Sequence, residues 1–286
     1  MNHSTSRPPR RIKNAGYVAL NAVDLAKTKD FYVRSCNFVP VFEDSEMVLL
    51  RSQFEHHCLA LYKSNIGGLR HLAFETMNDA DTEQLRDLLK SMNVPVREAP
   101  PMPGRMGLAF QFQDPDQNWV EVYNTMQRLP GRVSQGPFQL NHLGHFTMLS
   151  PDIHRMKDFY HQIGFRISDS SDRWVFMRTN TDHHSLALFP GKRTGLHHHA
   201  YEVEDWNQIK LLLDWMYVQE TVPEVGPILH TAGKNVCVYV RDPDDMLIEF
   251  YCELEQIYDD EDHIRDYPVK SFNLWLRNTA PEGFHR

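Results

Sequence analysis

Short stretches of alternating apolar and polar residues run along the chain, and segments with helical spacing separate them. From Leu143 to Leu149, every second residue would share one face of a strand, because side chains along a strand alternate with a period of two. Apolar residues then recur at the spacing of an amphipathic helix, and they are Ile153, Met156, Tyr160 and Ile163. This pattern predicts a strand that is followed directly by a helix.

Three residues predict where this helix begins and ends. Ser150 can cap its first turn, with Pro151 at the first helical position, where proline costs little because that N–H has no partner in the helix. Gly164 supplies the C-terminal stop. The helix is therefore expected between these residues.

The rest of the second half shows more alternating segments and one further helix. Strands are expected at residues 173–177, 185–189, 198–203, 235–240 and 246–252, with the helix at residues 206–217. The last two strands would form a hairpin around the turn at residues 242–245, because Pro243 presets the backbone dihedral that such a turn needs. The order strand, helix and then three or more strands predicts an α+β fold.

The same order of segments occurs twice in the chain. Residues 16–24 return as residues 144–152, an offset of 128 (152 − 24). The pair His56-His57 returns as His183-His184. A repeat of this length indicates two duplicated modules rather than a solenoid, and it allows one half to be compared with the other.

A chain of 286 residues also has about the length of two domains. The predicted organisation is a disordered basic leader at residues 1–14, an N-terminal module at 15–126, a linker at 127–140, a C-terminal module at 141–255 and a C-terminal tail at 256–286. The tail is acidic and then aromatic and has no counterpart in the first half. The sequence leaves open whether it packs on a module or on a neighbouring subunit.

The composition argues against several classes of function. The net charge is −8 and the Lys and Arg residues are scattered, which argues against a nucleic-acid surface, because such a surface neutralises phosphates. No apolar run approaches the roughly 20 residues of a membrane span, and the leader lacks the apolar core of a secretory signal. The four cysteines show no CxxC spacing and are most simply the reduced thiols of a cytoplasmic protein.

Candidate chemistry comes from the comparison of the two halves. At three matched places the second half has His145, His198 and Glu249. At the same places the first half has Tyr17, His71 and Glu121. Two imidazoles and one carboxylate on a common face form the facial triad of non-haem Fe(II) oxygenases, which leaves other positions on the ion open. We therefore expect a metal site in the second half and none in the first.

These residues resemble the ligand-bearing segments of the vicinal oxygen chelate superfamily, and specifically of its type I extradiol ring-cleavage dioxygenases. The similar segments are residues 144–146, 196–201 and 242–251, and the resemblance spans nearly all of residues 15–255. It implies two duplicated domains of tandem βαβββ modules, each with a curved mixed sheet around a pocket, and a first domain without metal. It also implies that His145, His198 and Glu249 bind Fe(II), or Mn(II) as in some relatives.

The resemblance further implies a reaction and its residues. The reaction is cleavage of a catechol-type ring next to the diol by O2, which gives a muconic semialdehyde-type product. His184 would be the acid/base residue, while His230 and Tyr239 would bind the substrate hydroxyl and an intermediate. The first half has Met102 and Gln111 at the places of this pair (230 − 128 and 239 − 128). The implied partners are a small aromatic diol, O2 and further copies of the chain in a homo-oligomer.

Two positions depart from the family pattern. Members that act on carboxylated catechols have arginines shortly before the place of His230, but residues 225–229 contain none. A neutral catechol is therefore the expected substrate, unless the tail supplies a cation. Thr147 stands where some relatives have Asn, so the hydrogen bonds near the metal are expected to differ.

Two other functions stay open at this point. One is a lyase or isomerase of the glyoxalase kind, in which the metal acts only as a Lewis acid and the ligands usually come from two modules. The other is a binding protein of the antibiotic-resistance type, which has a pocket but no complete triad. Dependence of activity on ferrous iron separates the dioxygenase from both.

Overall fold

The computed structural model describes residues 7–131, 136–265, 272–277 and 284. Parts of three expected segments lie outside the described residues, namely residues 1–6 of the leader, 132–135 of the linker, and 266–271, 278–283 and 285–286 of the tail. In the described part of the chain, no helix is long and apolar enough to cross a membrane.

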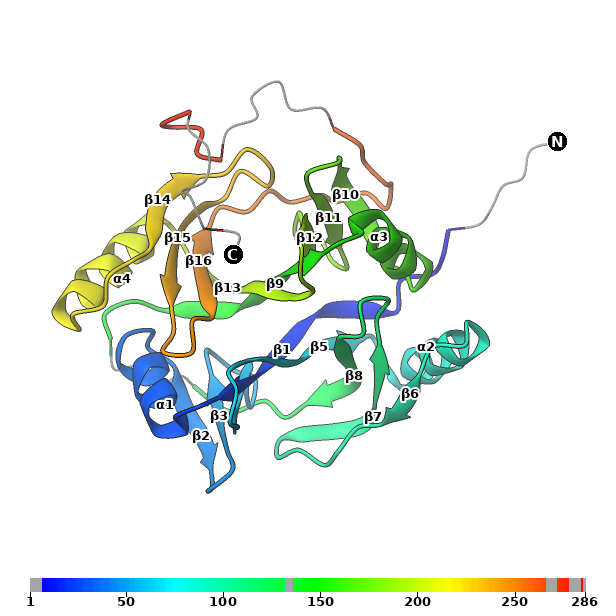
Figure 1. Ribbon diagram of the computed structural model, residues 1–286, viewed down its shortest axis with the longest axis horizontal. Helices are drawn as coiled ribbons and strands as arrows, with labels where there is room; N and C mark the ends of the chain where they lie inside the picture. The colour runs from blue at the N-terminus through cyan, green and yellow to red at the C-terminus, as the bar shows by residue number, and fades with distance from the viewer. Residues whose placement is uncertain (1–6, 132–135, 266–271, 278–283, 285–286) are drawn as a thin grey trace.

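Over the described residues, each half of the chain contributes eight strands and two helices (Figure 1). The first half consists of β1 (Ile12–Ala22), α1 (Leu25–Arg34), β2 (Val39–Glu43), β3 (Met47–Arg51), β4 (Leu59–Lys63), β5 (Gly68–Thr76), α2 (Asp79–Ser91), β6 (Val96–Glu98), β7 (Arg105–Gln113) and β8 (Trp119–Met126). The second half consists of β9 (Leu140–Ser150), α3 (Ile153–Gln162), β10 (Arg166–Ser170), β11 (Val175–Arg178), β12 (Leu186–Pro190), β13 (Gly195–Val203), α4 (Trp206–Val218), β14 (Val225–Leu229), β15 (Val236–Arg241) and β16 (Leu247–Cys252).

The strands of each half form one mixed sheet of eight strands within the described residues. The orders are β2-β3-β4-β1-β5-β8-β7-β6 and β10-β11-β12-β9-β13-β16-β15-β14. In each βαβββ unit the first strand pairs in parallel with the last, as β9 does with β12 and β13 with β16. Two units join through an antiparallel pair, β1 with β5 and β9 with β13. The expected α+β fold of duplicated βαβββ modules is confirmed, and each half contains two such units.

Two strands of the second half were not expected from the sequence. β10 and β14 are the edge strands of their sheet. β10 has the sequence Arg-Ile-Ser-Asp-Ser, which is too polar to show an apolar face, and β14 contains Gly226-Pro227. Proline removes a backbone donor, which an edge strand tolerates because one of its sides has no partner strand. The pattern of apolar residues is therefore weakest at the edges of the sheet.

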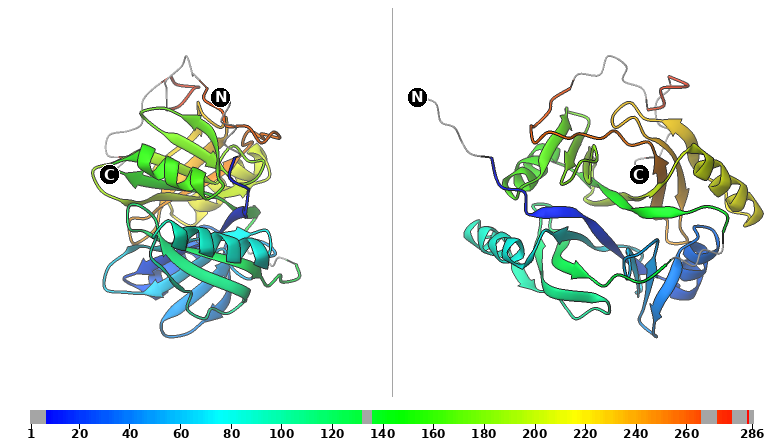
Figure 2. Two further views of the ribbon diagram at one scale, coloured as in Figure 1. Left: turned by 90° about the vertical axis from the view of Figure 1, so that its right-hand side faces the viewer. Right: turned by 180° about the vertical axis from the view of Figure 1, so that it is seen from behind.

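The two sheets pack against each other through one continuous apolar core. β1 and β9 run side by side across the middle of the molecule (Figures 1 and 2). Phe74 of β5 meets Phe146 of β9 in this core, with ring centroids 5.3 Å apart. The next residues on either side, His145 and Thr147, face the opposite side of the sheet and line a pocket there. Strand alternation therefore separates the core face from the pocket face.

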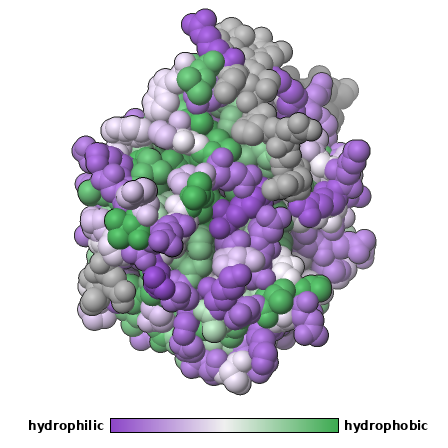
Figure 3. Space-filling model, turned by 60° about the vertical axis from the view of Figure 1, so that its left-hand side comes forward, coloured by the Kyte–Doolittle hydropathy of each residue, from purple (hydrophilic) through white to green (hydrophobic). Residues whose placement is uncertain are grey.

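The outer surface is mostly polar. On the face drawn in Figure 3, hydrophobic residues occur in groups between hydrophilic ones. The largest exposures of apolar side chains near α4 are those of Tyr217, at 85%, and Val222, at 82%.

The start of α3 differs from the expectation, while its end agrees with it. The N-cap is Asp152, whose side chain accepts a hydrogen bond from the backbone N–H of Arg155. Ser150 is the last residue of β9, and its hydroxyl oxygen accepts from the N–H of Asp152. The prediction of a Ser150 cap was wrong because Pro151 lies between strand and helix rather than in the first turn. Gly164 follows the C-cap with a φ of +113°, as a helix stop requires.

The leader belongs to the folded structure from residue 7 onward. β1 already begins at Ile12. Arg10 Nε lies 2.6 Å from a carboxylate oxygen of Asp260, at the acidic start of the tail. The leader expected at residues 1–14 therefore overlaps β1 at residues 12–14, and its Arg10 lies against the acidic start of the tail.

The described start of the tail packs on the C-terminal module. Arg166 of β10 donates two hydrogen bonds to the carboxylate of Asp260, at 3.0 and 3.1 Å. Arg178 of β11 has no exposed side-chain surface and donates to the backbone carbonyls of Asp259 (3.2 Å) and Glu261 (2.5 Å). Buried guanidinium groups need such partners, since an unpaired buried charge is costly. The acidic segment 259–262 therefore neutralises two arginines of the second sheet.

Candidate metal centre

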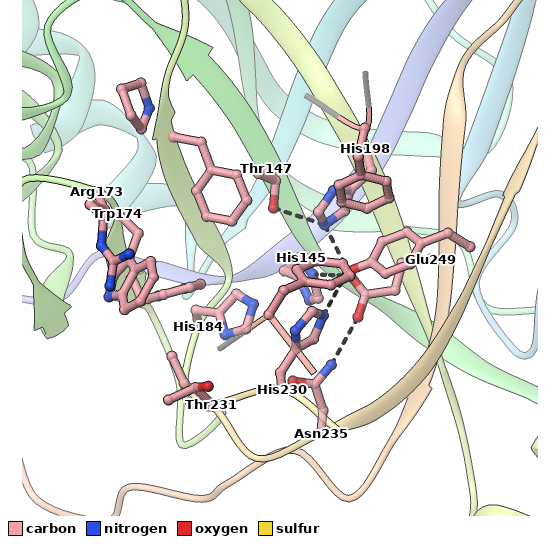
Figure 4. Close-up of a pocket in the computed structure, with 17 residues that line it drawn as sticks. His145, Thr147, Arg173, Trp174, His184, His198, His230, Thr231, Asn235 and Glu249 are labelled. Carbon is pink, nitrogen blue, oxygen red and sulfur yellow. Dashed lines mark hydrogen bonds and ion pairs between the residues drawn. The ribbon is translucent and has the colours of Figure 1, made fainter. Parts of the chain in front are cut away.

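Three adjacent strands in the middle of the second sheet carry the predicted triad. His145 lies on β9, His198 on β13 and Glu249 on β16 (Figure 4). The Nε2 atoms of His145 and His198 lie 3.2 and 3.0 Å from the same carboxylate oxygen, Oε2 of Glu249. One ligand atom of each residue lies within 4.8 Å of the other two. The structure thus brings the three side chains to one point.

The register of the strands explains this convergence. Ala200 of β13 lies opposite His145 on β9 and opposite Glu249 on β16. The side chain of Ala200 is small, so the longer side chains of His145 and Glu249 can meet above it. His198 stands two residues earlier on the same face of β13, opposite Thr147. Strand periodicity therefore selects His198 over His197 and His199.

Gly144 is needed because an aromatic ring packs against the strand there. A Cβ atom at Gly144 would lie 1.7 Å from the hydroxyl of Tyr251. The ring of Tyr251 lies 5.2 Å from the ring of His145, measured between centroids, and supports it from one side. The glycine before the first ligand therefore serves the packing of that ligand.

The charge states of the triad suit a divalent cation. Burial lowers the pKa of His198 to about 4, so its imidazole is neutral at pH 7 and can donate a lone pair. Burial by itself raises the pKa of Glu249, but hydrogen bonds and charge from His145 and His198 outweigh it and hold this pKa well below its usual value. Asn235 Nδ2 donates to the other carboxylate oxygen at 2.8 Å. The neutral imidazole of His198, the imidazole of His145 and an oriented carboxylate therefore fit a bound metal.

The matched place in the first half has a different arrangement. The hydroxyl of Tyr17 lies 3.0 Å from His71 Nε2 and donates to Glu121 Oε1 at 2.5 Å. Arg105 Nη1 also donates to this oxygen. Within the described residues, the groups that could hold a metal all belong to the second half. The carboxylate of Glu121 is already neutralised by a guanidinium.

The three predicted catalytic residues surround the triad. The ring of His184 lies 4.1 Å from the ring of His145, measured between centroids. His230 Nε2 lies 2.8 Å from the hydroxyl of Tyr239. Burial lowers the pKa of His184 well below its usual value and raises that of Tyr239 well above it, so both side chains are neutral. The structure brings all six predicted residues together, while their chemical roles stay predictions.

A pocket of about 340 Å³ opens in front of the triad (Figure 4). Its apolar wall consists of Trp174, Phe176, Phe189, Pro190, Ala232, Phe272 and Phe284. A pocket of this size, with an aromatic wall and a few polar groups at one end, suits a small aromatic ligand.

Sequence reasoning missed several residues of this pocket. Asn235 gave no signal, because a single amide before a strand has many uses. Phe272 and Phe284 come from the tail, which has no repeat for comparison. Arg173 enters from the turn between β10 and β11. The family pattern instead places its arginines at residues 225–229. The pocket therefore contains a positive charge that the expectation of a neutral substrate did not include.

Comparison with known proteins gives relatives over both halves. The family model described as the Glyoxalase/Bleomycin resistance protein/Dioxygenase superfamily matches residues 14–122 and 142–250. An iron-dependent extradiol dioxygenase of Rhodococcus jostii (strain RHA1) is 24% identical over 291 residues, covering 92% of this chain and 96% of the relative.

Solved structures with the same fold cover nearly the whole chain. Homoprotocatechuate 2,3-dioxygenase of Brevibacterium fuscum, in an anaerobic complex with 3,4-dihydroxyphenylacetate, has a TM-score of 0.87 at 23% identity and covers 98% of this chain and 93% of that chain. A Mn(II)-bound glyoxalase of Novosphingobium aromaticivorans has a TM-score of 0.85 at 25% identity and covers 95% of each chain. These likenesses show the fold.

Proposed function

Since the chain belongs to the glyoxalase/bleomycin resistance protein/dioxygenase superfamily, we propose that it is an extradiol ring-cleavage dioxygenase. Its substrate is a catechol-type aromatic diol, which O2 cleaves next to the diol to give a muconic semialdehyde-type product. The observation that carries this proposal is a complete triad of two His and one Glu in one half, with His184 beside it in the same pocket. The iron-dependent extradiol relative supports the same reaction class.

His145, His198 and Glu249 would hold Fe(II), with Mn(II) as the alternative. When bound, the metal would hold the diol and O2 next to each other and allow electron density to pass between them. The two imidazoles and the carboxylate described above supply the donor set for either ion. Asn235 keeps one oxygen of Glu249 turned towards the two histidines, because it hydrogen-bonds the other oxygen.

The side chains around the triad handle protons and position the ring. His184 is neutral and buried, so it can accept the proton of a diol hydroxyl and return it later. The pair of His230 and Tyr239, 2.8 Å apart, can hydrogen-bond an oxygen of the substrate or of the ring-opened product. Phe176 and Phe189 line the pocket and can pack against a substrate ring and shield the reacting atoms from water.

A second candidate is a lyase or isomerase of the glyoxalase kind, which the Mn(II)-bound glyoxalase structure favours. Such an enzyme uses its metal only to polarise a substrate oxygen and consumes no O2. The dioxygenase reaction explains more of the residues in the pocket, because it uses His184, His230 and Tyr239. A ligand-binding protein accounts for less still, since simple binding needs no triad.

The first experiment is oxygen uptake by protein loaded anaerobically with Fe(II), measured against a panel of catechols. The dioxygenase predicts one O2 consumed per catechol, a yellow product and loss of both in His145→Ala. Tight binding of one metal per chain with no uptake for any catechol would instead support the Lewis-acid enzyme. Absence of metal binding would leave only the fold and the family standing.

We also propose a homo-oligomer in a reducing, cytoplasmic compartment. The four cysteines, Cys36, Cys58, Cys237 and Cys252, are all buried and free, as expected where thiols stay reduced. The exposed apolar side chains at the end of α4, among them Tyr217 and Val222, offer a contact for a second copy. Light scattering on the purified protein measures the mass, and a mass near 33.5 kDa would contradict the oligomer.

A further inference from the structure

Three buried polar side chains form a chain that leads from the pocket wall into the protein. His184 Nδ1 lies 3.0 Å from His183 Nδ1. His183 Nε2 lies 2.7 Å from Oδ2 of Asp169. His184 is 4% exposed and lines the pocket, whereas Asp169 and His183 are fully buried and lie outside its wall. These two contacts therefore link Asp169 to the pocket through the two histidines.

Asp169 is paired with an arginine from the start of the tail, Arg265, which also donates from Nη1 to Glu255 at 2.6 Å. Arg265 donates from Nε to Oδ1 at 3.0 Å and from Nη2 to Oδ2 at 3.1 Å. Such a two-pronged pair satisfies a buried carboxylate. Burial lowers the pKa of His183, because a positive charge on a buried imidazole is costly, so His183 stays neutral beside this pair.

The hydrogen bonds then determine where each histidine carries its proton. An ionised carboxylate only accepts hydrogen bonds, so His183 donates from Nε2. A neutral imidazole has a single N–H, and Nδ1 of His183 must therefore accept from Nδ1 of His184. We propose that Asp169 and His183 are positioning residues that hold His184 with its unprotonated Nε2 towards the pocket.

The first half contains the histidine pair without the carboxylate. His56 Nδ1 and His57 Nδ1 lie 3.2 Å apart, like His183 and His184. Asp169 lies opposite Phe176 of β11, and at the corresponding register Phe42 lies opposite Leu49 of β3. The histidine pair of the first half therefore packs without a carboxylate at this place. A pair of this kind does not need the carboxylate for its packing.

The inference deepens the proposed function and rests on it for its catalytic consequence. His184 Nε2 accepts the proton of a diol hydroxyl, so an N–H bond forms while the O–H bond breaks and its electron pair stays on oxygen. The positive charge that arises on His184 is stabilised through His183 by the carboxylate of Asp169. The same proton passes to the product when the ring has opened. The three side chains then have their starting protonation states again. An imidazole in the opposite tautomer cannot perform this step.

The first test reads the tautomers directly and needs neither metal nor substrate. In protein labelled with ¹⁵N-histidine, long-range ¹H–¹⁵N correlation spectra show which ring nitrogen carries hydrogen, with assignment by single histidine variants. We expect His183 protonated on Nε2 and His184 on Nδ1. In Asp169→Asn the neutral amide oxygen is a weaker acceptor than the carboxylate, so the fraction of His184 protonated on Nδ1 should fall. A wild-type His184 protonated on Nε2 would overturn the inference.

The second test measures catechol turnover in the Fe(II)-loaded full-length protein. We expect kcat of Asp169→Asn to fall about 10²-fold, the size of a general acid–base contribution, while KM stays near the wild-type value. Asp182→Asn is the matched control. It removes a carboxylate charge one residue before His183, but Asp182 is not one of the three hydrogen-bonded side chains. It should keep the wild-type kcat and both wild-type tautomers.

A second variant guards against misfolding of Asp169→Asn, which leaves Arg265 with a weaker partner. His183→Phe keeps the pair of Asp169 and Arg265 and should show the same fall in kcat. Wild-type turnover together with unchanged kcat in both variants would overturn the inference while the proposed function stands. A wild-type protein that cleaves no catechol would contradict the proposed function, and the tautomer spectra would still decide the assignment.

Discussion

At the residue scale, Glu249 and Glu121 show how neighbours change the use of one side chain. Both are buried carboxylates at matched places in the two sheets. Glu249 is surrounded by two imidazoles and an amide, so its charge is available to a cation. Glu121 is paired with Arg105 and accepts from Tyr17. The difference in metal affinity that we propose follows from these partners.

The two halves provide a matched pair of variants for metal binding. We expect His198→Gln to lose most of the bound metal, because a triad with one donor removed holds a divalent ion much more weakly. His71→Gln, at the matched place in the first half, should keep the wild-type content of one metal per chain. Metal analysis after gel filtration measures both, and equal loss in both variants would contradict a site in the second half.

Arg173 gives a prediction on substrate choice. Its guanidinium stacks on Trp174, with Cζ 4.9 Å from the ring centroid, at the mouth of the pocket. The side chain is exposed, so an ion pair with a substrate contributes up to about 1 kcal/mol, which is roughly fivefold in affinity. We expect Arg173→Leu to raise KM for a catechol with a carboxylate substituent by up to that factor and to leave KM for unsubstituted catechol unchanged. Lys192→Leu removes an exposed charge that is not part of the pocket wall and should change neither value.

At the element scale, the helix cap of α3 and the edge strands of the second sheet were the hardest features to predict. Helices and central strands follow the apolar periodicity closely, because one of their faces is buried in the core. The start of α3 depends on one hydrogen bond, from the N–H of Arg155 to Asp152. Edge strands such as β10 have few apolar contacts and therefore little pattern.

The capping hydrogen bond of α3 can be tested by unfolding in urea. We expect Asp152→Ala to reduce the free energy of unfolding by about 1 kcal/mol, as for other N-cap substitutions. Ser150→Ala should reduce it less, because Ser150 bonds only the N–H before the first turn. Asp24→Ala removes the equivalent cap of α1 and should resemble Asp152→Ala. A larger loss in Ser150→Ala than in Asp152→Ala would restore the serine as the cap.

At the scale of the whole molecule, the acidic segment 259–262 ties together parts that are far apart in sequence. Asp260 accepts hydrogen bonds from Arg166 in the second sheet and lies beside Arg10 of the leader. The nearby Arg265 reaches Asp169 behind the pocket. The ends of the chain therefore contribute to the surroundings of the candidate site, although neither end has a motif.

This segment predicts a loss of stability in acid. The hydrogen bond from Arg166 holds the pKa of Asp260 below its usual value. A carboxyl group whose folded pKa lies below its unfolded pKa stabilises the protein above the unfolded value, about 4, and this contribution is lost as the pH falls through the folded value. We expect the urea midpoint of metal-free protein to fall more steeply below about pH 4 in the wild type than in Asp260→Asn. Asp172→Asn changes an exposed aspartate elsewhere and should follow the wild-type curve.

The sequence by itself determined the duplicated α+β fold and the six residues that meet at the candidate site. Strand periodicity and the internal repeat were sufficient for His145, His198 and Glu249, because side-chain alternation and matched positions are local properties of the chain. The resemblance to the extradiol dioxygenases, rather than spacing alone, implied His184, His230 and Tyr239, and the first half has Met102 and Gln111 at the places of the last two.

Only the tertiary structure decided which other groups surround that site. Phe272 and Phe284 reach the pocket from the tail, and Asp169 reaches His184 through His183. Arg173 enters from a turn between two strands. These contacts join residues without periodicity or a repeat, and their energies depend on burial and on partners far away in sequence. Charge balance in a buried site is a property of the folded molecule, so no local pattern of residues specifies it.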